Sequence, residues 1–170
     1  EKNGISIGMP GKYKIFLSES ILKEFSKEEI EAVIFHEAGH IYKRHFIKIS
    51  MLYTVLIFVD FGAVFYINGG FFSEGFYLFR VLFYLFVFIN INDIITAFVK
   101  RKFEYDADSY VVMLHGKADY LFSALEKMDK REGKSGKKSL YEMVFSEYPD
   151  IFERKKMIID KRNAGCEEEY

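Results

Sequence analysis

One block of the sequence, residues 49–98, is almost free of charged side chains. It contains four of them in 50 residues, and it carries 15 of the 31 Phe and Tyr residues of the chain. A block that stays apolar over this length is too long and too aromatic to be one face of an amphipathic helix. Insertion into a membrane is therefore the leading explanation.

Two apolar stretches make up this block, with a turn between them. The first, residues 49–68, has 20 residues, enough for a helix to span a bilayer core of about 30 Å. An Asn-Gly-Gly turn follows at 68–70, and the second stretch runs from 76 to about 98. The pattern predicts a transmembrane helical hairpin at 49–98.

Basic side chains flank both ends of the predicted hairpin, whereas the turn between its arms carries only Glu74. They are Lys43, Arg44 and Lys48 before the first arm, and Lys100, Arg101 and Lys102 after the second. Since Lys and Arg concentrate on the cytoplasmic side of membranes, we expect residues 1–48 and 99–170 to form one domain on that side. The alternative is a very apolar hairpin in the core of a soluble protein, which Asp60 in the middle of a stretch would favour.

Two charges inside the hairpin, on Asp60 and Arg80, lie at similar distances in sequence from its turn. An ionised side chain at mid-bilayer costs about 2.5 to 3.5 kcal/mol even on lenient insertion scales. We therefore expect these two side chains to pair across the hairpin.

Charge balance and cysteine content exclude several classes of protein. The net charge is −1, which does not fit a nucleic-acid-binding protein. Cys166 is the single cysteine, so neither a disulfide framework nor a Cys-based zinc ribbon is available. The sequence indicates no oligomeric state.

The sequence patterns in the polar parts of the chain predict mainly helices, with one short strand. Residues 12–17 are β-branched and aromatic enough for this strand, and they follow a Pro-Gly turn signal. A capping box, Ser26 with Glu29, predicts the start of a helix. Further helices are expected at 18–25, 94–114, 117–130 and 150–161, with a polar loop at 131–139.

The capped helix contains the motif HEAGH at residues 36–40. His36 and His40 are four residues apart, so both imidazoles project from one helix face and can hold the same Zn²⁺. Glu37 between them can reach a water on the metal and act as general base. Two His and one Glu can also occur by accident on a solvated helix face, but a catalytic zinc also needs a third protein ligand, and the chain offers one.

A candidate third ligand, Glu104, lies just after the second arm of the hairpin, on a helix that must return beside the first. Asp108 follows on the same face, placed to accept a hydrogen bond from a ligating imidazole. In isolation, Glu104, Asp106 and Asp108 could equally form a solvated acidic face. His45 is five residues beyond His40 and off the ligand face, so we expect it to support the site or lie at an interface. His115 reads as a residue of a loop or helix end.

With HEAGH, Glu104 and Asp108 in place, the chain resembles the HtpX and CAAX prenyl-endopeptidase family of gluzincin metallopeptidases, over roughly residues 5–160. The segments that lead into HEAGH and the segment RKFEYDAD at 101–108 also resemble those of the family. The resemblance implies a mainly α gluzincin-type metallopeptidase domain with a short edge strand and the inserted hairpin. It further implies zinc on His36, His40 and Glu104, with Asp108 as a supporting carboxylate.

One departure from the family pattern lies near the C-terminus. Relatives usually carry a His-Pro pair followed five residues on by Arg. Here Pro149 and Arg154 keep that spacing, but Tyr148 replaces the His. A tyrosine hydroxyl could donate the same hydrogen bond to an oxyanion, which makes Tyr148 a candidate catalytic residue. Simple packing of its ring is the alternative.

These observations favour a membrane-bound zinc endopeptidase with its active site on the cytoplasmic side. Its substrate would be a protein or peptide that lies along the strand at 12–17, and its role would be quality control of membrane proteins. Processing of prenylated proteins or peptides by the same site is a second reading. A non-catalytic membrane scaffold with a structural metal is a third, although such a site would not need Glu37.

Overall fold

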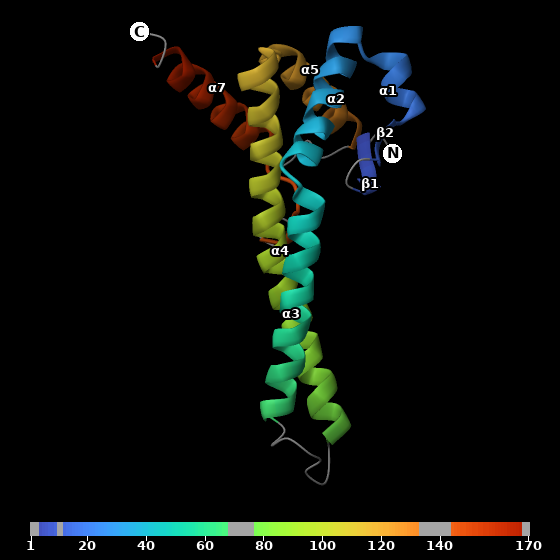
Figure 1. The fold of residues 1–170 in the computed structure, drawn as a ribbon, viewed down its shortest axis with the longest axis vertical. Coiled ribbons are helices and arrows are strands. Elements are labelled where there is room, and N and C mark those ends of the chain that lie inside the picture. The colour runs from blue at the N-terminus through green and yellow to red at the C-terminus, as the bar shows by residue number, and fades with distance from the viewer. Residues whose placement is uncertain (1–3, 10–11, 68–76, 133–143, 168–170) are drawn as a thin grey trace.

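The computed structural model describes residues 4–9, 12–67, 77–132 and 144–167. Over these residues the chain is mainly helical, as the sequence predicts, and forms a head at one end of a long stalk of two helices (Figure 1). The head contains strands β1 (Gly4–Met9) and β2 (Lys12–Leu17) and helices α1 (Glu19–Glu24), α2 (Lys27–Tyr42), α5 (Ala118–Glu132) and α7 (Ile151–Glu167). The stalk consists of α3 (His45–Ile67) and most of α4 (Tyr77–His115).

The two strands form an antiparallel hairpin, in which Gly4 pairs with Leu17 and Met9 with Lys12. The strand predicted at 12–17 is confirmed as β2, whereas β1 was not predicted. No third strand joins this sheet among the described residues, so each strand keeps one edge without a strand beside it. Such an edge can accept an extended peptide as a further strand.

Helix α2 begins at the predicted capping box. The Ser26 hydroxyl accepts a hydrogen bond from the backbone N–H of Glu29 at 3.2 Å, and the Glu29 carboxylate accepts one from the backbone N–H of Ser26 at 2.7 Å. The same buried carboxylate accepts hydrogen bonds from Ser123 at 2.5 Å and Lys127 at 2.6 Å, both on α5. One residue thus starts the helix and fixes it to its neighbour.

The stalk has an apolar surface that faces outward along its whole length. Both of its helices are long and apolar enough to cross a membrane. None of the most apolar part of α3, and only 11% of that of α4, is buried inside the protein. Large side chains such as Phe58, Phe61 and Phe79 are between 68% and 73% exposed. A hairpin in the core of a soluble protein would show the opposite, so the exposure favours a bilayer around the stalk.

A polar contact joins the two stalk helices, and it is not the predicted one. The Asn92 side chain on α4 donates a hydrogen bond of 2.5 Å to the Asp60 carboxylate on α3. Arg80 is 12 residues from Asn92 on the same helix, about 18 Å away along its axis. The expected pairing of Asp60 with Arg80 is therefore wrong, because the two helices align with a different register.

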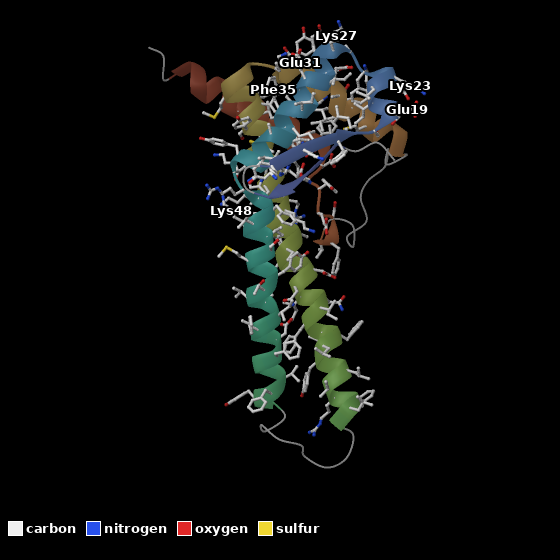
Figure 2. The ribbon with its side chains drawn as sticks, turned by 45° about the vertical axis from the view of Figure 1, so that its right-hand side comes forward. Glu19, Lys23, Lys27, Glu31, Phe35 and Lys48 are labelled. Carbon is white, nitrogen blue, oxygen red and sulfur yellow. The ribbon has the colours of Figure 1, made fainter. Side chains whose placement is uncertain are left out.

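Helix α4 runs without a break from the stalk into the head. It has 39 residues, so the second arm of the hairpin and the helix that carries Glu104 are one continuous element. In the head, α4 packs against α2, α5 and α7 around a small core. Its buried members are Ala32, Val111, Ala118, Leu121, Leu125 and Ile158. Lys48, at the head end of α3, lies where the head meets the stalk (Figure 2).

Candidate metal centre

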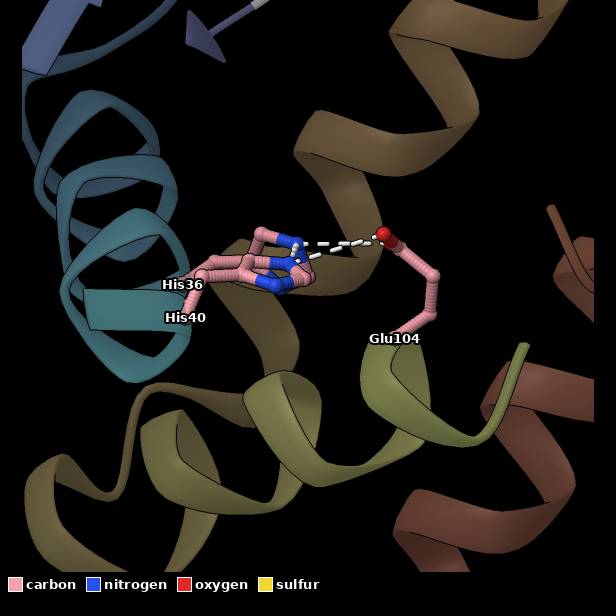
Figure 3. Close-up of side chains that lie close together, drawn as sticks. All are labelled: His36, His40 and Glu104. Atoms are coloured by element: carbon pink, nitrogen blue, oxygen red, sulfur yellow. Dashed lines mark hydrogen bonds and ion pairs between the residues drawn. The ribbon is translucent and has the colours of Figure 1, made fainter. Parts of the chain in front are cut away.

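Three possible metal-ligand side chains meet between α2 and α4, at the head end of the stalk (Figure 3). His36 and His40 project from one face of α2, and Glu104 faces them from α4. The two Nε2 atoms are 3.1 Å apart. Glu104 places one carboxylate oxygen 3.4 Å from the Nε2 of His36 and the other 3.5 Å from the Nε2 of His40. The structure thus brings together the three residues singled out by their sequence spacing.

This triangle of donor atoms has the dimensions of a metal site. Ligand atoms at about 2.0 to 2.1 Å from a tetrahedral zinc lie about 3.3 Å from one another. The distances observed are 3.1 Å between the two Nε2 atoms, and 3.4 and 3.5 Å from these atoms to the two different carboxylate oxygens of Glu104. Two imidazoles and one carboxylate are also a donor set typical of catalytic zinc, with a fourth position left for water or substrate. The residues present therefore fit a zinc ion.

Close contact between the two helices makes this geometry possible. Gly39 on α2 is buried, and a Cβ atom there would lie 3.2 Å from the Cα of Ala107 and 3.2 Å from the Cβ of Tyr110, both on α4. Those distances are shorter than ordinary van der Waals contact, so a side chain at this position would push the helices apart. The absence of a side chain at Gly39 therefore lets metal-ligand atoms on the two helices approach the same point.

Behind His36, the buried carboxylate of Asp108 is followed by the buried guanidinium of Arg154. The Nδ1 atom of His36 lies 3.0 Å from a carboxylate oxygen of Asp108, which is fully buried. Arg154 on α7 donates two hydrogen bonds to Asp108, of 2.7 and 2.6 Å, and approaches Glu104 to 3.5 Å. The sequence spacing drew attention to Arg154 but assigned it no role. Its partner lies 46 residues away, which no local pattern could indicate.

These contacts set opposite protonation preferences on the two imidazoles. Burial disfavours the charged form of His36, but Asp108 and Glu104 outweigh it and raise the pKa of His36 to about 9. Burial and the charge on His36 lower the pKa of His40 to about 4. Near neutral pH the metal-free cluster therefore carries a proton on His36, which a bound metal ion would have to displace.

Behind His40 lies a third histidine that does not belong to the triangle. His45 is 3% exposed, and its Nδ1 is 2.9 Å from the Nδ1 of His40. Its ring stacks on Phe103 with 4.2 Å between centroids and 5° between planes, and its Nε2 is 4.0 Å from Asp106. The sequence predicted that His45 would support the site or lie at an interface, and the structure places it in direct contact with His40. His115, in contrast, is the last residue of α4.

The two residues expected to carry out chemistry, Glu37 and Tyr148, are both at least partly exposed. Glu37 is half-buried on α2, between the two histidines in sequence. Tyr148, which is 59% exposed, precedes α7 in a segment held to α4 by an ion pair of 2.6 Å between Glu147 and Lys100. Burial and the nearby charges of Glu104, Glu147 and Glu37 raise the pKa of Tyr148 above its ordinary value. Its hydroxyl thus stays protonated and able to donate near neutral pH.

Comparisons with known proteins agree with this arrangement. The chain is 29% identical over 178 residues to CAAX prenyl protease 1 of Saccharomyces cerevisiae, which covers 89% of this chain and 39% of that protein. It is 27% identical over 176 residues to Protease HtpX of Alcanivorax borkumensis, which covers 88% of this chain and 58% of that protein. The crystal structure of S. mikatae Ste24p shares the fold, with a TM-score of 0.74 and 23% identity, over 92% of this chain and 42% of that one.

These matches confirm the resemblance that the motifs indicated. The chain spans about two fifths of the length of the yeast relative. The family model described as Peptidase family M48 matches residues 3–160, which is nearly all of it. A match over this much of the chain leads to one assignment: the protein belongs to peptidase family M48.

Proposed function

We propose that this chain contains the catalytic centre of a membrane-bound zinc endopeptidase. The observation that carries the proposal is the triangle formed by His36, His40 and Glu104, whose donor distances of 3.1 to 3.5 Å suit one zinc ion. Membership of a peptidase family supports the same reading. Residues 1–48 and 99–170 would form the peptidase domain, and residues 49–98 the membrane hairpin.

Each residue of the centre has one role in this proposal. His36, His40 and Glu104 hold the ion, which when bound lowers the pKa of a water molecule and polarises a peptide carbonyl. Glu37 accepts the proton of the attacking water and delivers it to the leaving amine. The retention of this carboxylate argues against a purely structural metal, which needs only ligands.

Two further residues would assist the reaction. Asp108 fixes the ring of His36, since an acceptor at Nδ1 leaves the Nε2 lone pair free for the metal. The Tyr148 hydroxyl would donate a hydrogen bond to the oxyanion that forms on the substrate carbonyl. Its exposure and the influence of Glu104 and Glu37 on its pKa support this role.

The substrate would be a protein or peptide segment at the cytoplasmic face of the membrane. Basic flanks at both ends of the hairpin support that orientation. An extended segment could pair with the free edge of β2. We favour membrane proteins in quality control as substrates. The similarity to CAAX prenyl protease 1 keeps prenylated substrates as the alternative.

Metal analysis combined with an activity assay tests the proposal. The protein extracted in detergent should contain one zinc per chain and cleave an unfolded protein such as casein. His36→Ala, His40→Ala and Glu104→Ala should each lower zinc occupancy. Glu37→Gln should retain zinc and lose turnover, because Glu37 contacts water and not the metal.

The possible outcomes separate the competing readings. Zinc retention in Glu104→Ala would make Asp106 or Asp108 the third ligand. Unchanged turnover in Glu37→Gln would refute the mechanism. Bound zinc without any cleavage, in the wild-type protein, would indicate the non-catalytic scaffold. Cleavage of a farnesylated peptide in strong preference to its unmodified counterpart would favour prenyl-protein processing.

A further inference from the structure

A short turn between α2 and α3 interrupts the helix and brings His45 beside His40. In an uninterrupted helix, a side chain five residues beyond His40 would point well away from it. Here α2 ends at Tyr42, and Arg44 adopts a left-handed backbone with φ of 54° before α3 begins at His45. A non-glycine residue is rarely found in this region and needs support from its surroundings. Because of this turn, the His45 imidazole occupies the position behind the donor triangle, where water would otherwise lie.

Only one nitrogen of His45 faces the candidate metal centre. Its Nδ1 faces the Nδ1 of His40 at 2.9 Å, while the Nε2 of His40 faces His36 and Glu104. The His45 ring is held flat against Phe103. Its other nitrogen, Nε2, is buried and has no hydrogen-bond partner among the described residues, the nearest carboxylate being Asp106 at 4.0 Å.

Coordination through Nε2 decides which nitrogen of each ring carries a proton. A histidine that binds a metal through the Nε2 lone pair carries its proton on Nδ1 and donates it to an acceptor. For His40 that acceptor is the Nδ1 of His45. His45 then carries its own proton on Nε2, where it faces the carboxylate of Asp106. All three groups are oriented consistently with a bond from His40 to a metal.

We propose that His45 is a positioning residue for the metal centre: it accepts the Nδ1 proton of His40 and so fixes the tautomer and ring orientation that the metal requires. This inference rests on the proposed zinc site. His45 would then do for His40 what we propose for Asp108, whose carboxylate lies 3.0 Å from the Nδ1 of His36. The two ligating rings are thereby held from opposite ends of the cluster.

Three substitutions at position 45 separate the acceptor from the packing. His45→Phe keeps a ring to stack on Phe103 but cannot accept a hydrogen bond. His45→Asn places an oxygen close to the former Nδ1, and His45→Leu has nearly the shape of Asn without that oxygen. The probe is Zn²⁺ alone, and its affinity is measured by competition with a chelating dye on the complete protein in detergent. Thermal unfolding of the metal-free proteins is measured in parallel.

A positioning role predicts an order of affinities that packing does not. His45→Phe and His45→Leu should bind Zn²⁺ about 10 to 100 times more weakly than wild type, as is typical for loss of a hydrogen bond to a ligand. His45→Asn should recover most of the affinity. Metal-free stability should follow a different order, highest in His45→Phe, because of the three substitutions only Phe keeps the stacked ring.

Two results would overturn the proposal. One is wild-type affinity in His45→Phe, and the other is equal loss in His45→Asn and His45→Leu. If His45→Phe does not fold, the comparison between Asn and Leu still decides. Failure of the zinc site itself would look different, because wild-type protein and His36→Ala would then bind Zn²⁺ equally weakly.

Discussion

Arg154 on α7 holds Asp108 on α4 through two hydrogen bonds, of 2.7 Å from Nε and 2.6 Å from an Nη nitrogen. Both side chains are buried, with 6% and 0% exposure. Asp108 in turn lies 3.0 Å from His36. The pair therefore fastens α7 to the helix of the site, and it holds a carboxylate beside a candidate ligand.

Removal of the guanidinium should destabilise the protein strongly. Arg154→Met leaves the Asp108 charge buried without its partner, which typically costs about 3 to 5 kcal/mol of unfolding free energy. Chemical denaturation of the protein in detergent measures it. Lys156→Met, on an exposed position of the same helix, is the control and should change little. Similar effects of the two substitutions would contradict a structural role for the pair.

Replacement of both partners should separate stability from metal binding. In Arg154→Met with Asp108→Leu, the Asp108 carboxylate is no longer buried without its guanidinium partner, so much of the lost stability should return. Zinc affinity should stay about 10 to 100 times weaker, because His36 still lacks its acceptor. Full recovery of zinc affinity in this double variant would show that Asp108 does not position His36.

The hydroxyl of Tyr148 should matter for turnover rather than for substrate binding. If it donates to the oxyanion, Tyr148→Phe should lower kcat by roughly ten- to a thousandfold and leave KM nearly unchanged. Tyr105→Phe is a matched control, because the Tyr105 hydroxyl bonds to Glu153 at 3.3 Å and is not assigned to the reaction. Loss of stability in Tyr148→Phe with unchanged kcat would assign its ring to packing.

Inside the stalk, Asn92 should contribute more to the free energy of unfolding than its neighbour Asn90. Asn92→Leu removes the donor to Asp60, and hydrogen bonds between membrane helices are worth about 0.6 to 2 kcal/mol. Asn90→Leu should cost less, because Asn90 donates to the carbonyl of Phe86 within its own helix. Unfolding in mixed micelles compares the two. The charge exchange Asp60→Arg with Arg80→Asp should give additive damage, and rescue by the exchange would restore the original pairing model.

Stability should fall in acid partly through Glu29. Burial alone would raise the pKa of Glu29, but hydrogen bonds from Lys127, Ser123 and the Ser26 backbone hold it below the ordinary value of 4.5. A carboxyl with a depressed pKa stabilises the folded state above its unfolded pKa, and this contribution is lost as the pH falls through the folded pKa. Wild type should therefore lose more stability between pH 7 and pH 3 than Glu29→Gln does.

The control for this prediction is Glu19→Gln on α1. Glu19 also forms an ion pair, with Lys23 at 2.6 Å, but both side chains are more than two thirds exposed and screened by solvent. Its substitution should leave the pH profile of unfolding nearly unchanged. Parallel profiles for wild type and Glu29→Gln would disprove the link.

Features that depend on neighbours in sequence could be predicted. The capping box, the strand at 12–17 and the two histidines one turn apart each follow from contacts over at most five residues. Glu104 was predictable for another reason: a hairpin must return its second arm beside its first, so the residues after it face the residues before it. The hairpin itself was indicated by composition, because residues 49–98 contain almost no charged side chains.

Features that depend on the packing of distant segments could not be predicted. The bond between Arg154 and Asp108 joins residues 46 positions apart, and β1 is defined by its pairing with β2. His45 meets His40 only because the helix breaks at Arg44. Asp60 lies opposite Asn92 and not Arg80 because the register depends on how two apolar surfaces fit, which counting from the turn does not capture.

Because α4 is continuous, it fixes the distance between the stalk and the candidate metal centre. The predicted second arm ends at about residue 98, and Glu104 lies six residues further on the same unbroken helix, about 9 Å along its axis. In the proposed orientation the metal centre stands at the height of the lipid headgroups. Under the proposed function, a membrane substrate would then be cut close to where it leaves the lipid, and distance from the bilayer would limit which bonds can reach the metal.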